Sequence, residues 1–253
     1  MPGLRKRSTA RRNQASCHLM TPARMFHYWA YFAICVILWE KPVHAQDSQE
    51  FWPEINAYVN LTPASRLYFV AAVGKEEDIP NLQGDFGAHF DFFLKPLLRP
   101  RLRELDPTKN RLFLFRAGYR YLNSLTGNSP PEQRVVLQAT ARVPLPANIL
   151  ASLRGGFDLR WISGSPFSWR YRTRLMFERS FSIRSYSFTP YVRGEFFYDS
   201  RYSKISRTAL AIGSTFPLTK RIELEPYFEY QHDTSKSIAS RVEVGGLVLS
   251  LYF

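Results

Sequence analysis

Strict alternation of apolar and polar side chains dominates the chain after residue 46. In residues 167–178 the odd positions carry Phe, Trp, Tyr, Thr, Leu and Phe, whereas the even positions carry Ser, three Arg, Met and Glu. Successive side chains of a β-strand point to opposite faces of the sheet. This segment therefore predicts a strand with one apolar face and one charged face, and a period of two favours strands over helices.

The same alternation recurs along the chain in segments separated by Pro, Gly, Ser, Asn and Asp. Regular recurrence of this kind predicts an all-β protein with many strands. Eight segments are clear and three are weaker, at residues 82–92, 113–121, 134–142, 152–161, 167–179, 188–198, 223–231 and 247–253, and at residues 52–61, 66–73 and 207–216.

Two architectures could use this pattern: a soluble β-sandwich with its apolar faces inside, or a membrane barrel with its apolar faces outside. The segments are about twice the usual soluble strand length of 5–6 residues and match the 9–11 residues of tilted membrane strands. All six lysines after residue 45 fall between the segments, whereas arginines occur within them. We therefore expect residues 46–253 to form a transmembrane antiparallel up-and-down β-barrel in which planar guanidinium groups pair with acids inside.

The strand number depends on where the two chain ends lie. If both ends are periplasmic, the number of strands must be even, although only eleven segments alternate. A missed strand is then expected in residues 95–110, with residues 97–104 as the candidate. Twelve strands is the first expectation; ten is the alternative, with residues 52–61 not crossing the membrane.

The last segment carries an assembly signal and a local conflict. The chain ends in LVLSLYF, and Leu249, Leu251 and Phe253 resemble the C-terminal signal by which bacterial outer-membrane barrels are recognised for insertion. Arg241 and Glu243 share the parity of these apolar residues, which would direct two charges outward. We expect a β-bulge at residues 245–246, both glycine, to shift the register by one and return the charges to the interior.

A periplasmic C-terminus also predicts the orientation of the barrel. Counting backward places residues 123–132, 162–166, 199–205 and 233–239 outside the cell. Aromatic residues flank both sets of turns, as expected of the two aromatic belts of a membrane barrel.

Residues 1–45 are predicted to be a cleaved signal peptide. A basic stretch precedes the uncharged run FHYWAYFAICVILW at residues 26–39, and the small residues of Val-His-Ala then predict cleavage between Ala45 and Gln46. An uncleaved anchor is the alternative, but the run is shorter than the roughly 20 residues that a membrane helix needs. The candidate start residues are Met1, Met20 and Met25.

Composition excludes several classes of function. Both cysteines, Cys17 and Cys35, lie in the predicted signal peptide, so the rest of the chain has no disulfide, no cysteine nucleophile and no thiolate metal site. The net charge of +13 falls to +7 after residue 45, where 27 basic residues stand against 20 acidic ones. Since most of these cations are expected inside the barrel, we do not expect nucleic acid as a partner.

Several short motifs resemble one bacterial family. They are PYVRGEFFY at residues 190–198, AGYRY at residues 117–121, the alternating Arg170, Arg172 and Arg174, and Trp52 near the mature start. They are similar to the domain-of-unknown-function family twenty-four ninety, with the similarity covering roughly residues 50–253. The resemblance implies an outer-membrane β-barrel and supplies no substrate.

The inward-facing charges permit two interpretations. They could form a salt-bridge lattice that fills a passive structural barrel. They could instead line a small-solute channel that favours anions, because parity places more arginines than acids inside. The candidate lumen residues are Arg116, Arg120, Arg142, Arg154, Arg160, Arg170, Arg172, Arg174, Arg193, Glu195, Arg207, Glu223, Glu225 and Glu229.

An outer-membrane lipid hydrolase is the rival from another class. Only His89 and His232 follow the signal peptide, and Ser235 lies close to His232 in the sequence. His232 has outward parity and no longer hydrolase motif surrounds it, so we predict no enzymatic activity, catalytic residue, cofactor or metal. The expected partners are outer-membrane lipid, lipopolysaccharide and the barrel-assembly machinery of a Gram-negative-type bacterium.

Overall fold

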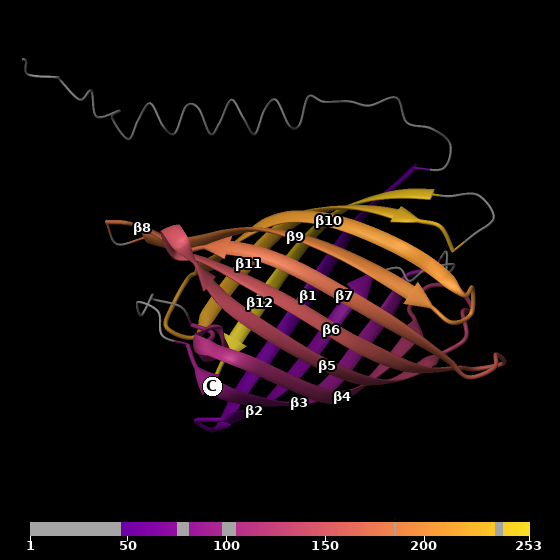
Figure 1. The fold of residues 1–253 in the computed structure, drawn as a ribbon. Helices are drawn as coiled ribbons and strands as arrows, with labels where there is room; N and C mark the ends of the chain where they lie inside the picture. The colour runs from indigo at the N-terminus through magenta and orange to yellow at the C-terminus, as the bar shows by residue number, and fades with distance from the viewer. Residues whose placement is uncertain (1–46, 75–80, 98–104, 185, 236–239) are drawn as a thin grey trace, which may run out of the picture. The chain divides into compact units, whose positions relative to one another are not determined.

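The computed structural model describes residues 47–74, 81–97, 105–184, 186–235 and 240–253. These residues form twelve β-strands and two short 3-10 helices, and eleven of the strands close into a barrel (Figure 1). The all-β barrel predicted from the alternation is confirmed. No helix among the described residues is long and apolar enough to cross a membrane. The predicted signal peptide and Gln46 lie outside the described residues.

The strands follow one another with short connections. Strands β4 to β7 and β9 to β11 coincide with alternating segments of the sequence. The elements are β1 (Asp47–Thr62), β2 (Ser65–Gly74), β3 (Gln83–Pro96), η1 (Pro107–Asn110), β4 (Arg111–Ser124), β5 (Glu132–Leu145), η2 (Pro146–Asn148), β6 (Ile149–Ile162), β7 (Ser168–Arg179), β8 (Phe181–Ile183), β9 (Tyr186–Asp199), β10 (Lys204–Pro217), β11 (Ile222–Asp233) and β12 (Ser240–Tyr252).

Ten of the eleven pairings in the wall are antiparallel, and one is parallel. β8 pairs only with the start of β9, so β7 pairs with β9 and β8 stands outside the wall. The barrel closes where β12 runs parallel to β1, from Asp47 opposite Arg241 to Tyr58 opposite Tyr252. A parallel ladder has evenly spaced, slanted hydrogen bonds and can complete the wall between two strands that run the same way.

The expectation of an even strand number in the wall was wrong. Because β1 and β12 are parallel, β1 begins at the end of the barrel opposite to Phe253 (Figure 1), so the two ends of this domain do not lie on the same side. The ten-strand alternative is also excluded, since residues 52–61 belong to β1 in the wall. Most of the candidate extra strand, residues 98–104, lies outside the described residues, but β3 pairs directly with β4 and leaves no place between them.

The predicted bulge at residues 245–246 is absent. β12 pairs with β11 and with β1 without a register shift, so Arg241 and Glu243 face outward, opposite His232 and Tyr230. Glycine serves another purpose here, because a Cβ at residue 246 would lie 2.0 Å from the ring of Tyr227. Both charges lie near the start of β12, where Arg241 is exposed and Glu243 is half-buried.

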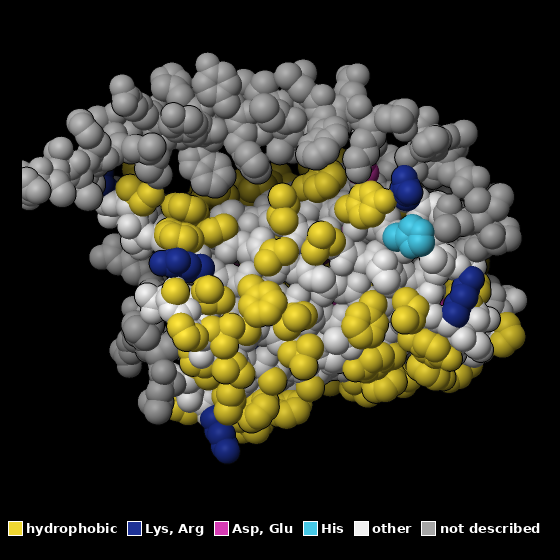
Figure 2. Space-filling model, turned by 45° about the horizontal axis from the view of Figure 1, so that its top comes forward, with side chains coloured by type: hydrophobic (Ala, Val, Ile, Leu, Met, Phe, Trp, Pro, Cys, Tyr) yellow, Lys and Arg dark blue, Asp and Glu magenta, His cyan; other side chains and the backbone are white. Residues whose placement is uncertain are grey.

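The outer surface is apolar and the inner surface is polar. Figure 2 shows hydrophobic side chains spread over the visible face of the barrel, with the few basic side chains toward its two ends. Trp169 and Phe228 are 36% and 46% exposed on the outside, whereas Arg170 is buried and Arg172 lines an internal cavity. A soluble sandwich would bury the apolar side chains and expose the charged ones, which is the opposite of this arrangement. The charged side chains are therefore sought inside the barrel as the candidate functional site.

Candidate functional site in the barrel interior

The barrel encloses one large polar cavity. Its volume is about 370 Å³, and all eleven wall strands together with η1 contribute to its lining. Every contributing strand directs alternate residues inward, which is why side chains far apart in the sequence meet here.

The structure brings the fourteen predicted lumen residues together in the interior. Thirteen of them line the cavity; Arg160 instead is 1% exposed within an ion-pair network at the end of the barrel where β6 ends. The thirteen are Arg116, Arg120, Arg142, Arg154, Arg170, Arg172, Arg174, Arg193, Glu195, Arg207, Glu223, Glu225 and Glu229.

That network consists of two buried carboxylates, each bound by two guanidinium groups. Glu132 on β5 accepts hydrogen bonds from Arg134 and Arg160. Arg160 also donates to Asp199 at 2.8 Å, and Arg201 donates to the same carboxylate at 2.8 Å. Both acids are fully buried, and such charges are tolerated in a low-dielectric interior only when paired. The network ties β5, β6 and β9 together at this end of the barrel.

At the opposite end, the connection between β3 and β4 enters the cavity. Asp106 precedes η1 and caps it, accepting hydrogen bonds from the backbone N–H and the hydroxyl of Thr108, each at 2.9 Å. The same carboxylate accepts a hydrogen bond from Arg66 on β2 at 2.8 Å. Burial by itself would raise the pKa of Asp106, but nearby Arg66 and other cations, together with the Thr108 N–H, outweigh it and hold the pKa below its usual range.

Two further contacts fasten η1 across the barrel. Thr108 is fully buried, and its carbonyl accepts a hydrogen bond from Arg142 on β5 at 3.0 Å. Lys109 forms an ion pair of 3.0 Å with Glu178 on β7. The segment is thus held by strands β2, β5 and β7 and occupies this end of the interior. We call residues 105–110 the plug segment.

A stack of aromatic rings covers the inner side of the parallel closure. Tyr252 on β12 stacks on Tyr58 at 5.0 Å between ring centres, Tyr58 on Tyr68 at 4.9 Å, and Tyr68 on His89 at 5.0 Å. The guanidinium of Arg66 lies over Tyr58 at 4.1 Å, a cation–π contact. The stack crosses four neighbouring strands and reinforces the wall where β1 meets β12.

The sequence matches one family profile. The family is described as "Protein of unknown function (DUF2490)", and the match covers residues 88–241, more than half of the chain. The chain belongs to this family. No curated protein matches the sequence. The resemblance noted from short motifs is confirmed, although the matched range is shorter than residues 50–253.

The motifs of this DUF2490 protein all lie in the wall. Residues 190–198 belong to β9 and residues 117–121 to β4, and both fall within the matched range. The three alternating arginines of β7 point into the cavity. Trp52 on β1 also lines the cavity but falls outside the match.

Counted over the buried and cavity-lining residues of the described strands, the charges of the DUF2490 barrel are numerically balanced, but these strands line the cavity itself with eleven arginines and six acids, so the anion preference stays a prediction. Arg241 and Glu243 face outward, while Glu132, Asp199 and Asp233, which the prediction missed, are buried inside. Parity within their own strands could have identified all three. Among the described strand residues that are buried or line the cavity, twelve are arginines and twelve are acids: Arg66, Arg116, Arg120, Arg134, Arg142, Arg154, Arg160, Arg170, Arg172, Arg174, Arg193 and Arg207, with Glu54, Asp85, Asp91, Glu132, Asp158, Glu178, Glu195, Asp199, Glu223, Glu225, Glu229 and Asp233.

The residues considered for hydrolysis stand on different faces of the DUF2490 barrel. His232 lies on the outer side of β11, opposite Arg241. Ser235 is buried, and its hydroxyl donates a hydrogen bond to Asp233 on the inner side. His89 belongs to the aromatic stack. Within the described ranges, no three His, Cys, Asp or Glu side chains gather as metal ligands.

Proposed function

We propose that this protein is an outer-membrane β-barrel that admits small polar solutes to its charged interior and is held closed by the plug segment. One observation carries the proposal: a polar cavity, lined by residues of all eleven wall strands, lies inside a barrel whose outer surface is apolar.

Membrane insertion is supported by the outer surface. Large apolar side chains such as Leu210 and Phe228 are about half exposed along the strands. Contiguous apolar surface of this extent is unfavourable in water and favourable against hydrocarbon chains. Export by residues 1–45, cleavage after Ala45, and recognition of Leu249, Leu251 and Phe253 by the assembly machinery belong to the same proposal.

The dimensions of the interior favour small solutes. A cavity of about 370 Å³ falls near the lower end of the roughly 300–1,000 Å³ typical of small-molecule sites. Nearly half of its lining residues are charged and many of the others carry hydroxyl or amide groups, so only polar solutes would replace the water inside without loss of hydrogen bonds. Because residues 105–110 close one end through ion pairs and hydrogen bonds, passage would require their release.

A passive structural barrel is the alternative, and the dense charge pairing favours it. Glu132, Asp199 and Asp91 each bind two guanidinium groups, which stiffens the wall. Under this alternative the cavity is only the space left between paired charges.

Reconstitution of the mature protein in planar lipid bilayers distinguishes the two functions. A channel predicts discrete conductance steps that are rare in the wild type and frequent after Asp106→Ala, which loosens the plug segment. A passive barrel predicts silence from both proteins. Fractionation of cells tests location independently, since the proposal requires the chain in the outer membrane and fails if the chain is found in the soluble fraction.

A further inference from the structure

The charges around the cavity are sorted onto opposite walls. Strands β5, β6 and β7 line it with six arginines and no acid: Arg134, Arg142, Arg154, Arg170, Arg172 and Arg174. Strands β11, β12 and β1 line it with four glutamates and no cation: Glu54, Glu223, Glu225 and Glu229. The strand order places β6 directly across the barrel from the junction of β12 and β1. This uneven placement of positive and negative charge produces an electric field that runs across the cavity.

The arginine wall holds a cation without a partner. Arg154 makes no hydrogen bond or ion pair with any described residue. Its neighbour across the strands on one side is Arg174, which pairs with Glu195 at 2.8 Å, and on the other side is Thr140. Among the described residues, Arg172 on β7 forms a single ion pair, with Asp158 at 3.9 Å. Cations that crowd together in a protein interior with too few counter-charges are suited to bind an anionic group.

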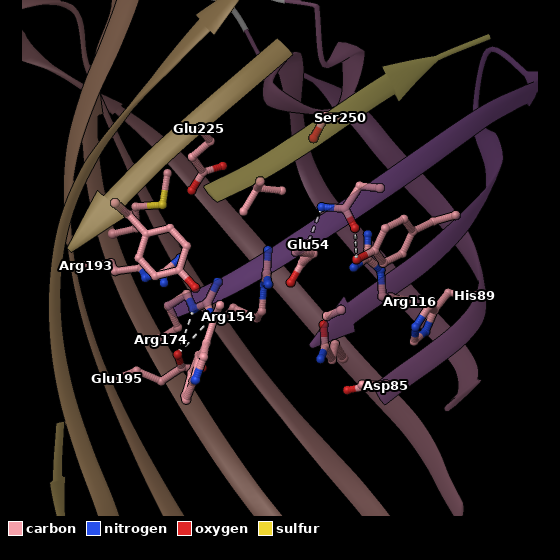
Figure 3. Close-up of a pocket in the computed structure, with 18 of the residues that line it drawn as sticks. Glu54, Asp85, His89, Arg116, Arg154, Arg174, Arg193, Glu195, Glu225 and Ser250 are labelled. Atoms are coloured by element: carbon pink, nitrogen blue, oxygen red, sulfur yellow. Dashed lines mark hydrogen bonds and ion pairs between the residues drawn. The ribbon is translucent and has the colours of Figure 1, made fainter. Parts of the chain in front are cut away.

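The opposite wall holds carboxylates that lack cations. Glu54 on β1 accepts a hydrogen bond from the amide of Asn56 at 2.7 Å and forms no ion pair among the described residues. Within the part of the chain that the structure describes, Glu223 and Glu225 accept hydrogen bonds only from tyrosine hydroxyls, those of Tyr252 and Tyr191. Figure 3 shows Arg154 beside Arg174, and Glu54 and Glu225 reaching into the same cavity from other strands.

From this arrangement we infer that the cavity binds a small zwitterion, with its carboxylate at Arg154 and its ammonium group at Glu54. The inference rests on the proposed function insofar as the solute must enter the barrel, and it names the class of solute. A planar guanidinium group matches a carboxylate in a two-point contact, and Glu54 offers acceptor oxygens to an ammonium group. A simple anion would satisfy only one wall. Amino acids and dipeptides carry both charges and are small enough for the cavity.

Calorimetric titration of the detergent-solubilised mature protein tests the inference. Three probes separate the charges: diglycine carries both, N-acetylglycine only the negative one, and glycinamide only the positive one. Diglycine should bind more tightly than either. Arg154→Gln and Glu54→Gln should each weaken diglycine binding by about tenfold or more, the loss expected for one charged hydrogen-bonded contact.

The controls use the same substitutions outside the cavity. Arg221→Gln and Glu243→Gln, at an exposed turn and on the outer face, should leave diglycine binding unchanged. Arg154→Gln should weaken N-acetylglycine but not glycinamide, and Glu54→Gln the reverse. Equal binding of diglycine and N-acetylglycine, or no binding of diglycine, overturns the inference. Binding by a protein that is silent in bilayers refutes the channel alone, whereas conductance without diglycine binding refutes the zwitterion site alone.

Discussion

Removal of the Asp106 side chain should open the barrel at the end occupied by the plug segment. The carboxylate accepts three hydrogen bonds, from Arg66 at 2.8 Å and from the N–H and hydroxyl of Thr108 at 2.9 Å. A hydrogen bond to a charged group contributes about 1.5–3 kcal/mol, and loss of a helix cap costs about 1 kcal/mol. Arg66 keeps its second partner, Asp91, at 2.8 Å, so Asp106→Ala does not leave an unpaired buried cation.

We therefore expect Asp106→Ala to weaken the closed state by about 3 kcal/mol, which corresponds to roughly 150-fold in the ratio of open to closed forms. The assay is the open probability of single barrels in planar bilayers. Asp106→Asn keeps an acceptor for the Thr108 N–H but removes the charge, and it should give an intermediate increase.

Lys220→Ala, at an exposed turn at the same end of the barrel, is the matched control and should behave as the wild type. An unchanged open probability in Asp106→Ala, in a protein that folds and conducts, would show that residues 105–110 do not close the barrel. An increase in Lys220→Ala as large as that in Asp106→Ala would assign the effect to general loosening of this end.

Asp106, the buried ion-pair network and the parallel closure each give one further prediction. Because the pKa of Asp106 is lowered, its carboxylate stabilises the closed form fully above the ordinary carboxylate pKa of about 4, and this stabilisation is lost as the pH falls through the lowered pKa. The open probability should therefore stay constant between about pH 7 and pH 5. Glu132→Gln removes the buried charge that Arg134 and Arg160 share, although Arg160 keeps its ion pair with Asp199 at 2.8 Å, and it should cost about 3 kcal/mol, measured as a lower unfolding temperature on semi-native gels. Residues 46–253 contain no cysteine, so Gln49→Cys and Lys220→Cys can be labelled singly if residues 1–45 are removed on export as proposed. A membrane-impermeant maleimide should reach the two positions from opposite sides of the membrane, and labelling from the same side would contradict the parallel closure.

Much of the wall could be predicted because alternation is a local property. A side chain's face depends on its parity within the strand, so Arg170 and Trp169 are assigned to opposite faces by sequence alone. The same rule brought all fourteen predicted lumen residues inside. It failed for Arg241 and Glu243 only because a bulge was added to avoid outward charges, and the structure keeps the simple parity.

The contents of the cavity were less predictable. Residues 105–110 do not alternate, and their place in the interior depends on partners in three distant strands. Likewise, parity shows that Arg154 and Glu54 both face inward, but it does not show that they stand on opposite walls. That relation depends on the circular order of the strands.

The alternation alone is enough to predict an all-β barrel with an apolar exterior and a charged interior, because a period of two is a property of neighbouring residues and does not depend on the rest of the chain. The number of strands in the wall, the parallel pairing of β1 with β12 and the end of the barrel that the plug segment occupies emerge only from the folded arrangement. These features depend on pairings between residues as far apart as Asp47 and Arg241, and the energy of such long-range contacts leaves no local signal along the chain.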